Sequence, residues 1–222
     1  MQISKTQLSG WFKKLSKVLT ASLLVLLLTP IVEASDRYPT EREMQQLRSE
    51  LTRKIQELRS GEFSNYLDDY RTEAEKQQHQ VLVNAWSKIN PSIAPFLGMW
   101  SGYEQRLAIY PSSIQGQVCI IEISEVGFSH LATGIVVNNE EIRTSDRRFI
   151  LRSGTYLGSV GVYGDRAFLE GKIPWKTPYP LFVPSPSTLR NEEVESEEQI
   201  KQALQQFEEA HCSASLPTRR SY

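Results

Sequence analysis

The spacing of hydrophobic residues changes at about residue 96, and this change divides the chain into a helical part and a β part. From residue 96 to residue 173, short apolar segments alternate with Gly, Asn and Asp. Turn residues recur there at intervals of about 8–12 residues, which is typical of an all-β sandwich or barrel. The pattern predicts an α+β protein: a small antiparallel β-barrel or sandwich over residues 91–173, with an N-terminal helical segment and one C-terminal helix.

The helical segment is expected over residues 35–90. Thr40 and Glu43 form a T-x-x-E capping box, in which each side chain satisfies a free amide of the first helical turn. Apolar residues then recur three or four positions apart, which places them on one helical stripe. The stripe consists of Met44, Leu47, Leu51, Ile55 and Leu58. A second apolar pattern runs from Phe63 to Ile89 and ends before Pro91. These helices pack on the β-domain or on each other, or the first stripe binds a partner protein.

The β-strands follow from alternation and from turn residues. Residues 99–110 read as one long strand, with Gly102 as a β-bulge that exchanges the two faces. Residues 117–124 and 127–137 follow, with Cys119, Ile121 and Ile123, and then Leu131, Ile135 and Val137, expected on the core face. Asn138-Asn139 predicts a hairpin turn because Asn tolerates positive φ. Gly164-Asp165 joins the last hairpin of the domain.

Gly98-Met99-Trp100 resembles the G-x-W motif at the first strand of calycins, the lipocalin-like barrels. The resemblance implies that Trp100 closes one end of the barrel, and that Arg152 or Arg166 corresponds to the Arg that packs over it. It also implies a small apolar ligand. The wall residues would then be Trp100, Tyr103, Leu107, Ile121, Ile135, Tyr156 and Leu169. A barrel of about seven or eight short strands is, however, expected to fill its interior with its own side chains.

The C-terminal part is rich in proline before one further helix. Five prolines between residues 174 and 186 indicate an extended strap over residues 174–195. Trp175 and Tyr179 either tuck this strap onto the barrel or present it to another domain. Ser196 and Gln199 form a capping box for a helix over residues 196–212, followed by a frayed tail over residues 213–222.

The N-terminus has the order of a secretory signal. Residues 1–17 carry four Lys, residues 18–28 are almost purely apolar, and Val32-Glu33-Ala34 supplies small residues for cleavage after Ala34. A retained anchor is the alternative, but the apolar run is shorter than the roughly 20 residues that span a bilayer. We therefore expect export to the periplasm or another extracytoplasmic compartment, with no stable membrane span after cleavage.

Charge and composition narrow the function. The whole chain has a net charge of −1, and the first 34 residues contribute four Lys and one Glu, so the mature chain is mildly acidic. Nucleic-acid binding depends on clustered Lys and Arg, so it is not expected. The histidines at 79, 130 and 211 lack metal-ligand spacing, and no cofactor or G-x-S-x-G motif occurs. Four arginines, at 143, 147, 148 and 152, form either a salt-bridged sheet face or an anion site.

Cys119 and Cys212 are the two cysteines of the chain. In an exported protein they are compatible with one disulfide, which would stabilise the fold by roughly 4 kcal/mol in the chain-entropy model. Two free thiols, one buried and one exposed, are the alternative. Together these features favour an exported, non-enzymatic binding protein, such as an assembly or accessory factor, that contacts a protein partner through the N-terminal helix. A carrier of a small apolar ligand is the alternative, and a hydrolase is disfavoured.

Overall fold

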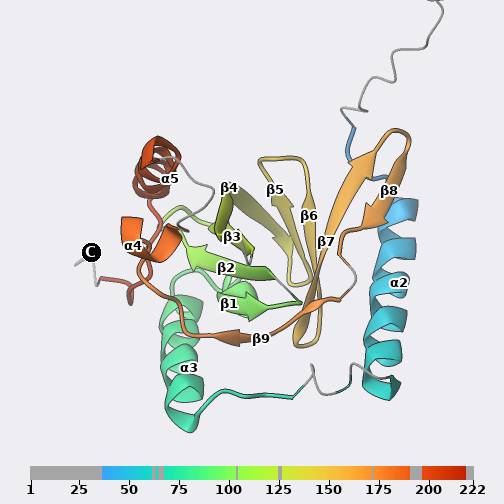
Figure 1. Cartoon of the computed structure of the whole chain (residues 1–222), viewed down its shortest axis with the longest axis horizontal. Helices are drawn as coiled ribbons and strands as arrows, with labels where there is room; N and C mark the ends of the chain where they lie inside the picture. Colours follow the sequence, from blue (N-terminus) through green and yellow to red (C-terminus); the bar gives the residue numbers. More distant parts are fainter. Residues whose placement is uncertain are drawn as a thin grey trace, which may run out of the picture. The chain divides into compact units, whose positions relative to one another are not determined.

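A closed ring of antiparallel strands forms the centre of the molecule (Figure 1). The structure is a computed structural model that describes residues 37–61, 64, 68–103, 105–124, 127–171, 173–190 and 197–218. The expected signal over residues 1–34, the apolar residues Phe63, Tyr66 and Leu67, and the capping residue Ser196 lie outside the described residues. The chain from Asp36 to Tyr222 forms one unit. The described part confirms an α+β fold with a small β-barrel, not a sandwich.

Eight strands of the described chain form the barrel, and a ninth flanks it. Successive strands pair from β1 to β7, and β9 closes the ring by pairing with both β1 and β7. β8 pairs with β7 outside the ring. The strands are β1 Gly98–Ser101, β2 Gln105–Pro111, β3 Gln117–Ser124, β4 Gly127–Asn138, β5 Glu141–Thr144, β6 Phe149–Ser153, β7 Tyr156–Tyr163, β8 Arg166–Leu169 and β9 Trp175–Tyr179.

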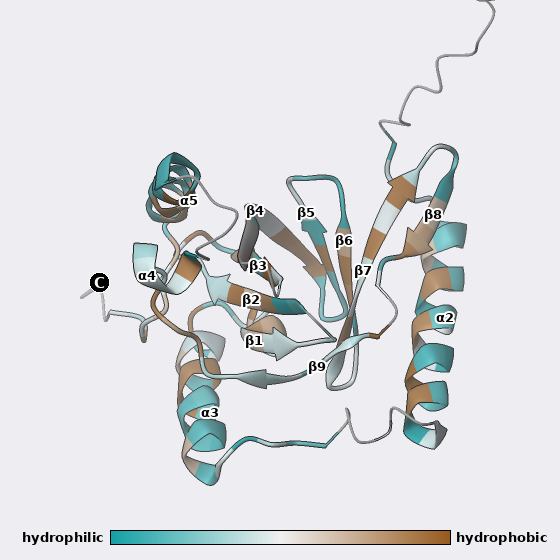
Figure 2. Ribbon diagram, viewed as in Figure 1, coloured by the Kyte–Doolittle hydropathy of each residue, from teal (hydrophilic) through white to brown (hydrophobic). Residues whose placement is uncertain are grey.

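Helices cover parts of the outer surface of the barrel. The helices are α2 Glu41–Ser60, α3 Glu73–Ser87, the 3₁₀ turn η2 Ala94–Phe96, α4 Pro186–Leu189 and α5 Glu197–Glu209. α2 contacts β6, β7 and β8, whereas α5 contacts β4 and shares a core with residues of β2 and β3. α3 contacts η2 and β9. Figure 2 shows the apolar stripe of α2 and the apolar strands of the barrel in brown.

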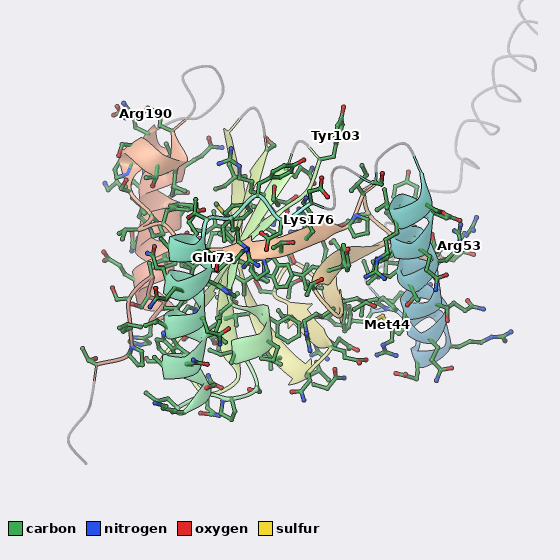
Figure 3. All side chains as sticks on the ribbon, turned by 90° about the horizontal axis from the view of Figure 1, so that it is seen from below. Met44, Arg53, Glu73, Tyr103, Lys176 and Arg190 are labelled. Carbon is green, nitrogen blue, oxygen red and sulfur yellow. A yellow bond between two sulfur atoms is a disulfide. The ribbon has the colours of Figure 1, made fainter. Side chains whose placement is uncertain are left out.

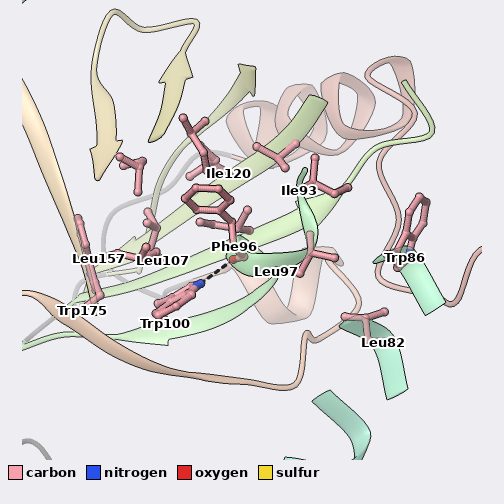
Figure 4. Close-up of a cluster of buried hydrophobic side chains, with 14 residues drawn as sticks. Leu82, Trp86, Ile93, Phe96, Leu97, Trp100, Leu107, Ile120, Leu157 and Trp175 are labelled. Atoms are coloured by element: carbon pink, nitrogen blue, oxygen red, sulfur yellow. Dashed lines mark hydrogen bonds between the residues drawn. The ribbon is translucent and has the colours of Figure 1, made fainter. Parts of the chain in front are cut away.

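The interior of the barrel is packed with large apolar side chains (Figure 4). Trp100 is only 2% exposed, and its indole N–H donates a hydrogen bond of 2.7 Å to the carbonyl of Phe96. Because Phe96 belongs to η2, this bond fastens the 3₁₀ turn to the first strand. The other members of this buried cluster are Leu82, Trp86, Ile93, Leu97, Leu107, Ile109, Val118, Ile120, Ile142, Ile150, Leu157 and Trp175.

The α2 helix forms as the sequence predicts. The Thr40–Glu43 capping box is present, and all five residues of the predicted stripe are buried. Four of them, Met44, Leu47, Leu51 and Ile55, pack against Phe149, Leu151 and other residues of β6, β7 and β8. Arg48 also forms an ion pair with the buried Glu141 at the start of β5. The predicted packing of this helix on the β-domain is confirmed.

Two predicted elements have different bounds. Residues 99–110 form the β1–β2 hairpin instead of one strand, and the Gly102 amide donates to the Gln105 carbonyl in the turn. A side chain at Gly102 would collide with Trp175, which explains the glycine better than a bulge does. α3 begins at Glu73, about ten residues later than the apolar pattern suggests, because Thr72 and Glu75 form a capping box there.

The faces of β4 are the reverse of the prediction. Ile135 and Val137 are exposed and Leu131 is half-buried against α5, whereas Ala132 and Gly134 turn toward the barrel interior. A Cβ at Gly134 would lie 2.5 Å from Ile142, so a glycine is needed for β4 to close on the core. Because the interior positions of β4 are small, hydrophobicity alone selects the wrong face.

The Pro-rich segment contributes a strand to the barrel. Residues 175–179 were predicted to be part of an extended strap because prolines are frequent there. The structure accommodates Pro178 through a register irregularity opposite β1 and a positive φ at Thr177. Trp175 is buried in the interior, as expected for a tucked-in aromatic. The segment after β9 lies on the outer face, where Phe182 contacts the Tyr110 ring edge-on.

Candidate functional site

The residues expected to line a ligand cavity do not lie on one surface. Trp100 and Leu107 face the interior, but Ile121 packs outside the barrel with α5. Tyr156 and Leu169 pack beneath α2. Tyr103 is 45% exposed in the β1–β2 turn and points away from the barrel (Figure 3), and Ile135 is 52% exposed on β4. The predicted set is therefore corrected: five of its seven members lie outside the interior.

One position expected from the calycin resemblance can be located. Arg152 lies next to the end of the barrel that Phe96 closes, with its guanidinium 5.8 Å from the centre of the Phe96 ring. It also donates to the carbonyls of Asn139 and Gly154. Arg166 is exposed in the β7–β8 hairpin. Of the two candidate arginines, Arg152 is therefore the one at the Trp100 end of the barrel, and the aromatic ring that its guanidinium contacts is that of Phe96.

A charged network occupies the opposite end of the barrel interior. Glu122 follows Val118 and Ile120 on the inner face of β3, and His130 lies opposite Glu122 on β4. Arg148 directly precedes β6. Ser159 on β7 is fully buried, and it pairs with Ile150 of β6, whose side chain belongs to the interior cluster. The inner surface therefore changes from apolar to ionic along the barrel axis, and we call this end the barrel mouth.

Arg148 is the centre of the mouth network. Its guanidinium lies 2.8 Å from a Glu122 oxygen, 2.8 Å from an Asp146 oxygen and 3.6 Å from a Glu170 oxygen. His130 Nε2 lies 2.9 Å from the same Asp146 oxygen. Three carboxylates and one imidazole thus surround one guanidinium, and Ser159 donates its hydroxyl hydrogen bond to Glu170.

The protonation states of this network follow from its contacts. Burial by itself raises the pKa of Asp146, but hydrogen bonds from His130, Thr144 and Arg148 outweigh burial and hold that pKa well below its usual range. Burial by itself lowers the pKa of Arg148, and the attraction of Glu122 and Asp146 raises it above its ordinary value. Both groups are therefore ionised, and Arg148 cross-links the strands at the mouth.

Three of the four arginines in the predicted group, Arg143, Arg148 and Arg152, have partners within the chain. Arg148 is surrounded by carboxylates, and Arg152 donates to backbone carbonyls. The Arg143 guanidinium lies 4.6 Å from the centre of the Tyr38 ring. A bound anion would have to compete with three carboxylates for Arg148, which favours the salt-bridged alternative for this group.

A groove lies outside the barrel, between α3, the segment after β9 and the C-terminal segment. Its volume is about 750 Å³, within the range of about 300–1,000 Å³ that is usual for binding sites. No Asp, Glu, Lys or Arg is among its lining residues. The lining consists of Ala74, Gln77, Gln78, His79, Val81, Leu82, Pro180, Leu181, Ala214, Ser215 and Leu216. We call this surface the α3 groove.

His79 contributes an uncharged wall to the α3 groove. Its Nε2 lies 2.8 Å from the Leu97 carbonyl, so a neutral ring with a proton on Nε2 donates a hydrogen bond there. Burial lowers the pKa of His79 more than this carbonyl raises it, and Arg71 lowers it further. The same ring packs against Gly98, where a side chain would collide with Pro178. His79 thus connects α3 to the first barrel strand and stays neutral.

The C-terminal wall of the α3 groove is anchored by a disulfide. Cys119 on β3 and Cys212 after α5 form this bond, with their Cα atoms 6.2 Å apart. The bridged alternative is therefore the one found. α5 is also held by its aromatic contact, because the Phe207 ring meets the Tyr110 ring edge-on at 5.0 Å.

The predicted partner-binding residues are used within the fold. The α2 stripe faces the barrel, Trp175 lies in its interior and Tyr179 pairs with Met99 in the sheet. The α3 groove could not be predicted from the sequence, because its three walls lie far apart in the chain. One local signal was present: Ala74, Gln77, Gln78 and Val81 share one face of the predicted second helix, and this face is uncharged but only partly apolar.

Comparisons with models of protein families, with curated proteins and with solved structures found no match for this chain. Among the described residues, no group of three or more His, Cys, Asp or Glu side chains is placed to hold a metal ion. The described helices include none that is both long and apolar enough to cross a membrane. The assignment of function therefore depends on the mouth network, the filled interior and the α3 groove.

Proposed function

We propose that this protein is an exported, non-enzymatic binding protein that holds a short uncharged apolar segment of a partner protein in the α3 groove. The observation that carries the proposal is the contrast between a barrel interior filled by Trp100 and its neighbours and an open groove on the outside. The carrier alternative needs an apolar cavity inside the barrel, so the filled interior weighs against it. A calycin-like origin of the barrel remains part of the proposal, supported by the buried Trp100 at its first strand.

The chemistry of the groove favours a peptide segment as its occupant. Leu82, Leu181 and Leu216 offer apolar contacts, and Gln77 and Gln78 offer primary amides. A primary amide both donates and accepts hydrogen bonds, which matches the alternating N–H and C=O groups of an extended peptide backbone. A charged side chain would lose its hydration here without gaining an ionic partner, so neutral apolar side chains are favoured.

The non-enzymatic part of the proposal is supported by the state of the mouth network. Each charged side chain at the mouth pairs with another, and the Ser159 hydroxyl donates to Glu170 and not to His130. A nucleophile–base pair requires a hydrogen bond between a hydroxyl or thiol and its base. The arrangement instead supports a structural role, in which the ionic network closes the barrel end.

A selection experiment tests the proposed site. Displayed random peptides of about seven residues are selected on the full chain, and the dissociation constant of the best binder is measured by fluorescence anisotropy. A peptide of that length spans about 24 Å when extended. We expect the selected peptides to share an uncharged apolar centre. Val81→Arg, which places a charge in the groove, is expected to weaken binding at least about tenfold, equivalent to 1.4 kcal/mol.

Ile89→Arg is the matched control for this variant. Val81 is 48% exposed and lines the groove, and Ile89 is 49% exposed just beyond the same helix but does not line it. Both substitutions add one positive charge to a surface of equal accessibility. Binding that is weakened equally by both, or by neither, would show that the peptides bind elsewhere and would overturn the α3 groove as the site.

A further inference from the structure

The C-terminal wall of the α3 groove is attached to the barrel at one covalent point. Cys212 is joined to Cys119, which is completely buried on the outer face of β3. The groove-lining residues Ala214, Ser215 and Leu216 follow only two to four positions later in the chain. The position of this wall relative to the sheet is therefore set close to the disulfide.

Apart from the partial packing of Ala214 on the buried cluster beneath α5, the remaining attachments of the wall are a few hydrogen bonds. The Ser113 amide donates to the His211 carbonyl, and the Ser213 amide donates to the Pro111 carbonyl, both at 3.0 Å. On the other side of the groove, the Trp86 indole donates to the Ser215 carbonyl at 3.1 Å. A net contribution of roughly 1 kcal/mol for each such bond is small compared with the entropy gained when a terminal segment is released.

We propose that the Cys119–Cys212 disulfide is a redox latch for the α3 groove: the oxidised chain holds the groove closed on three sides, and reduction releases residues 213–218 and removes one wall. This proposal rests on the α3 groove being the binding site. Partner binding is then limited to the oxidised protein, which links the activity of the chain to an oxidising compartment outside the cytoplasm.

The chemical step requires a dithiol reductant. One of its thiolates attacks the sulfur of Cys212, the half-buried partner, and the disulfide breaks with Cys119 leaving as a thiolate that takes up a proton. The second thiol of the reductant then attacks the mixed disulfide and releases the Cys212 thiol. The reductant ends as a disulfide, and two electrons and two protons have passed to the protein.

Hydrogen exchange and peptide binding, measured on the same full chain, test the latch. The oxidised chain is compared with the chain reduced by dithiothreitol, using the peptide selected against the groove. Reduction should speed exchange of the Ser113 and Ser213 amides at least about tenfold, while amides of the β6–β7 pair stay protected. Peptide binding should weaken by a similar factor, because one wall is lost.

Variants separate the latch from other effects of the reductant. Cys212→Ser should behave without reductant as the reduced chain does. If Cys212→Ser does not fold, the reduced natural chain serves instead. The Cys119→Ala, Cys212→Ala double variant should not respond to dithiothreitol, and a response would assign the effect to something other than the latch.

Unchanged exchange at Ser113 and Ser213 after verified reduction would overturn the latch. A failure of the oxidised chain to bind any selected peptide would instead overturn the proposed function, and exchange alone would then decide the latch.

Discussion

Removal of the Trp100 side chain is the most direct perturbation of the barrel. The ring lies between η2 and the strands, is almost completely buried and contacts the interior cluster (Figure 4). Its indole N–H also satisfies the Phe96 carbonyl. Trp100→Ala removes both the packing and the hydrogen bond, whereas Trp100→Phe retains an aromatic ring and removes the donor. The two variants therefore separate the two contributions.

The expected magnitudes follow from burial. Trp100→Ala should lower the free energy of unfolding by about 3–5 kcal/mol, the cost typical of deleting a buried aromatic side chain. Because a domain of this size is stable by about 5–15 kcal/mol, such a loss takes a large share of the total. Trp100→Phe should cost about 1–3 kcal/mol, since the Phe96 carbonyl then stays buried without its donor.

Urea denaturation followed by circular dichroism, under non-reducing conditions, measures both losses. Equal slopes against urea are required for the comparison, because a changed slope indicates a changed surface exposure on unfolding. Tyr163→Ala is the control: that ring is 78% exposed, and its loss should change stability by less than about 0.5 kcal/mol. A cost below about 1 kcal/mol for Trp100→Ala would refute the view that this ring closes the barrel end.

Three further predictions concern the mouth network and the N-terminus. Arg148→Met should lower the free energy of unfolding, measured in urea, by about 3 kcal/mol, because Glu122 and Asp146 lose their partner. The control Arg53→Met, at an exposed ion pair, should lower it by less than about 0.5 kcal/mol. Equal losses for the two variants would contradict the central role of Arg148. Because the pKa of Asp146 is lower in the folded state, its ionised form stabilises the fold at pH values above the unfolded pKa of about 3.9, and this contribution decreases as the pH falls toward the folded pKa. The difference in thermal stability between the natural chain and Asp146→Asn should therefore shrink below about pH 4. A difference that stays constant with pH would argue against this ionic contribution. Intact mass of the protein from its native host should correspond to a chain that begins after Ala34, and a mass that includes Met1 would exclude the cleavage.

Local signals predicted the first helix of the fold and the burial of Trp100. The T-x-x-E box at Thr40 and the spacing of the α2 stripe depend only on residues three or four apart, and the structure forms both. Trp100 could be placed in the core from a three-residue motif. The disulfide between Cys119 and Cys212 was one of two alternatives. The sequence shows that such a bond is chemically possible, but it does not show that the two cysteines lie close together in the fold.

The inner faces of the strands were not predictable, because several strands are buried on both sides. On β2, Leu107 and Ile109 face the interior while Ala108 and Tyr110 pack beneath the C-terminal region. One face of β2 is apolar because it lines the interior and the other because the C-terminal region covers it, so the strand lacks the alternation of apolar and polar residues that would identify its inner face. Gly134 adds to this ambiguity, since its inner position is required by close packing and carries no hydrophobic side chain.

The mouth network and the α3 groove were missed for a similar reason. Glu122 lies near the end of β3 and Arg148 lies directly before β6, so 26 residues separate them and no local pattern joins them. The groove depends on tertiary contact between α3 and Ser215, whose carbonyl accepts from the Trp86 indole across 129 residues. Sequence periodicity reports which face of an element is apolar, and it does not report which elements that face will meet.

The arrangement of covered and uncovered surfaces explains why binding is proposed outside the barrel. α2 and α5 each bury one apolar flank of the ring, and the interior is closed by Trp100 at one end and by Arg148 at the other. Each of these surfaces has an internal occupant that would have to be displaced at the cost of its burial. The α3 groove differs because its lining has no such occupant among the described residues and because the disulfide at Cys212 is the covalent attachment of one of its walls to the barrel. A ligand can therefore enter the groove without disrupting the core, and the chemistry of that bond sets whether the groove exists.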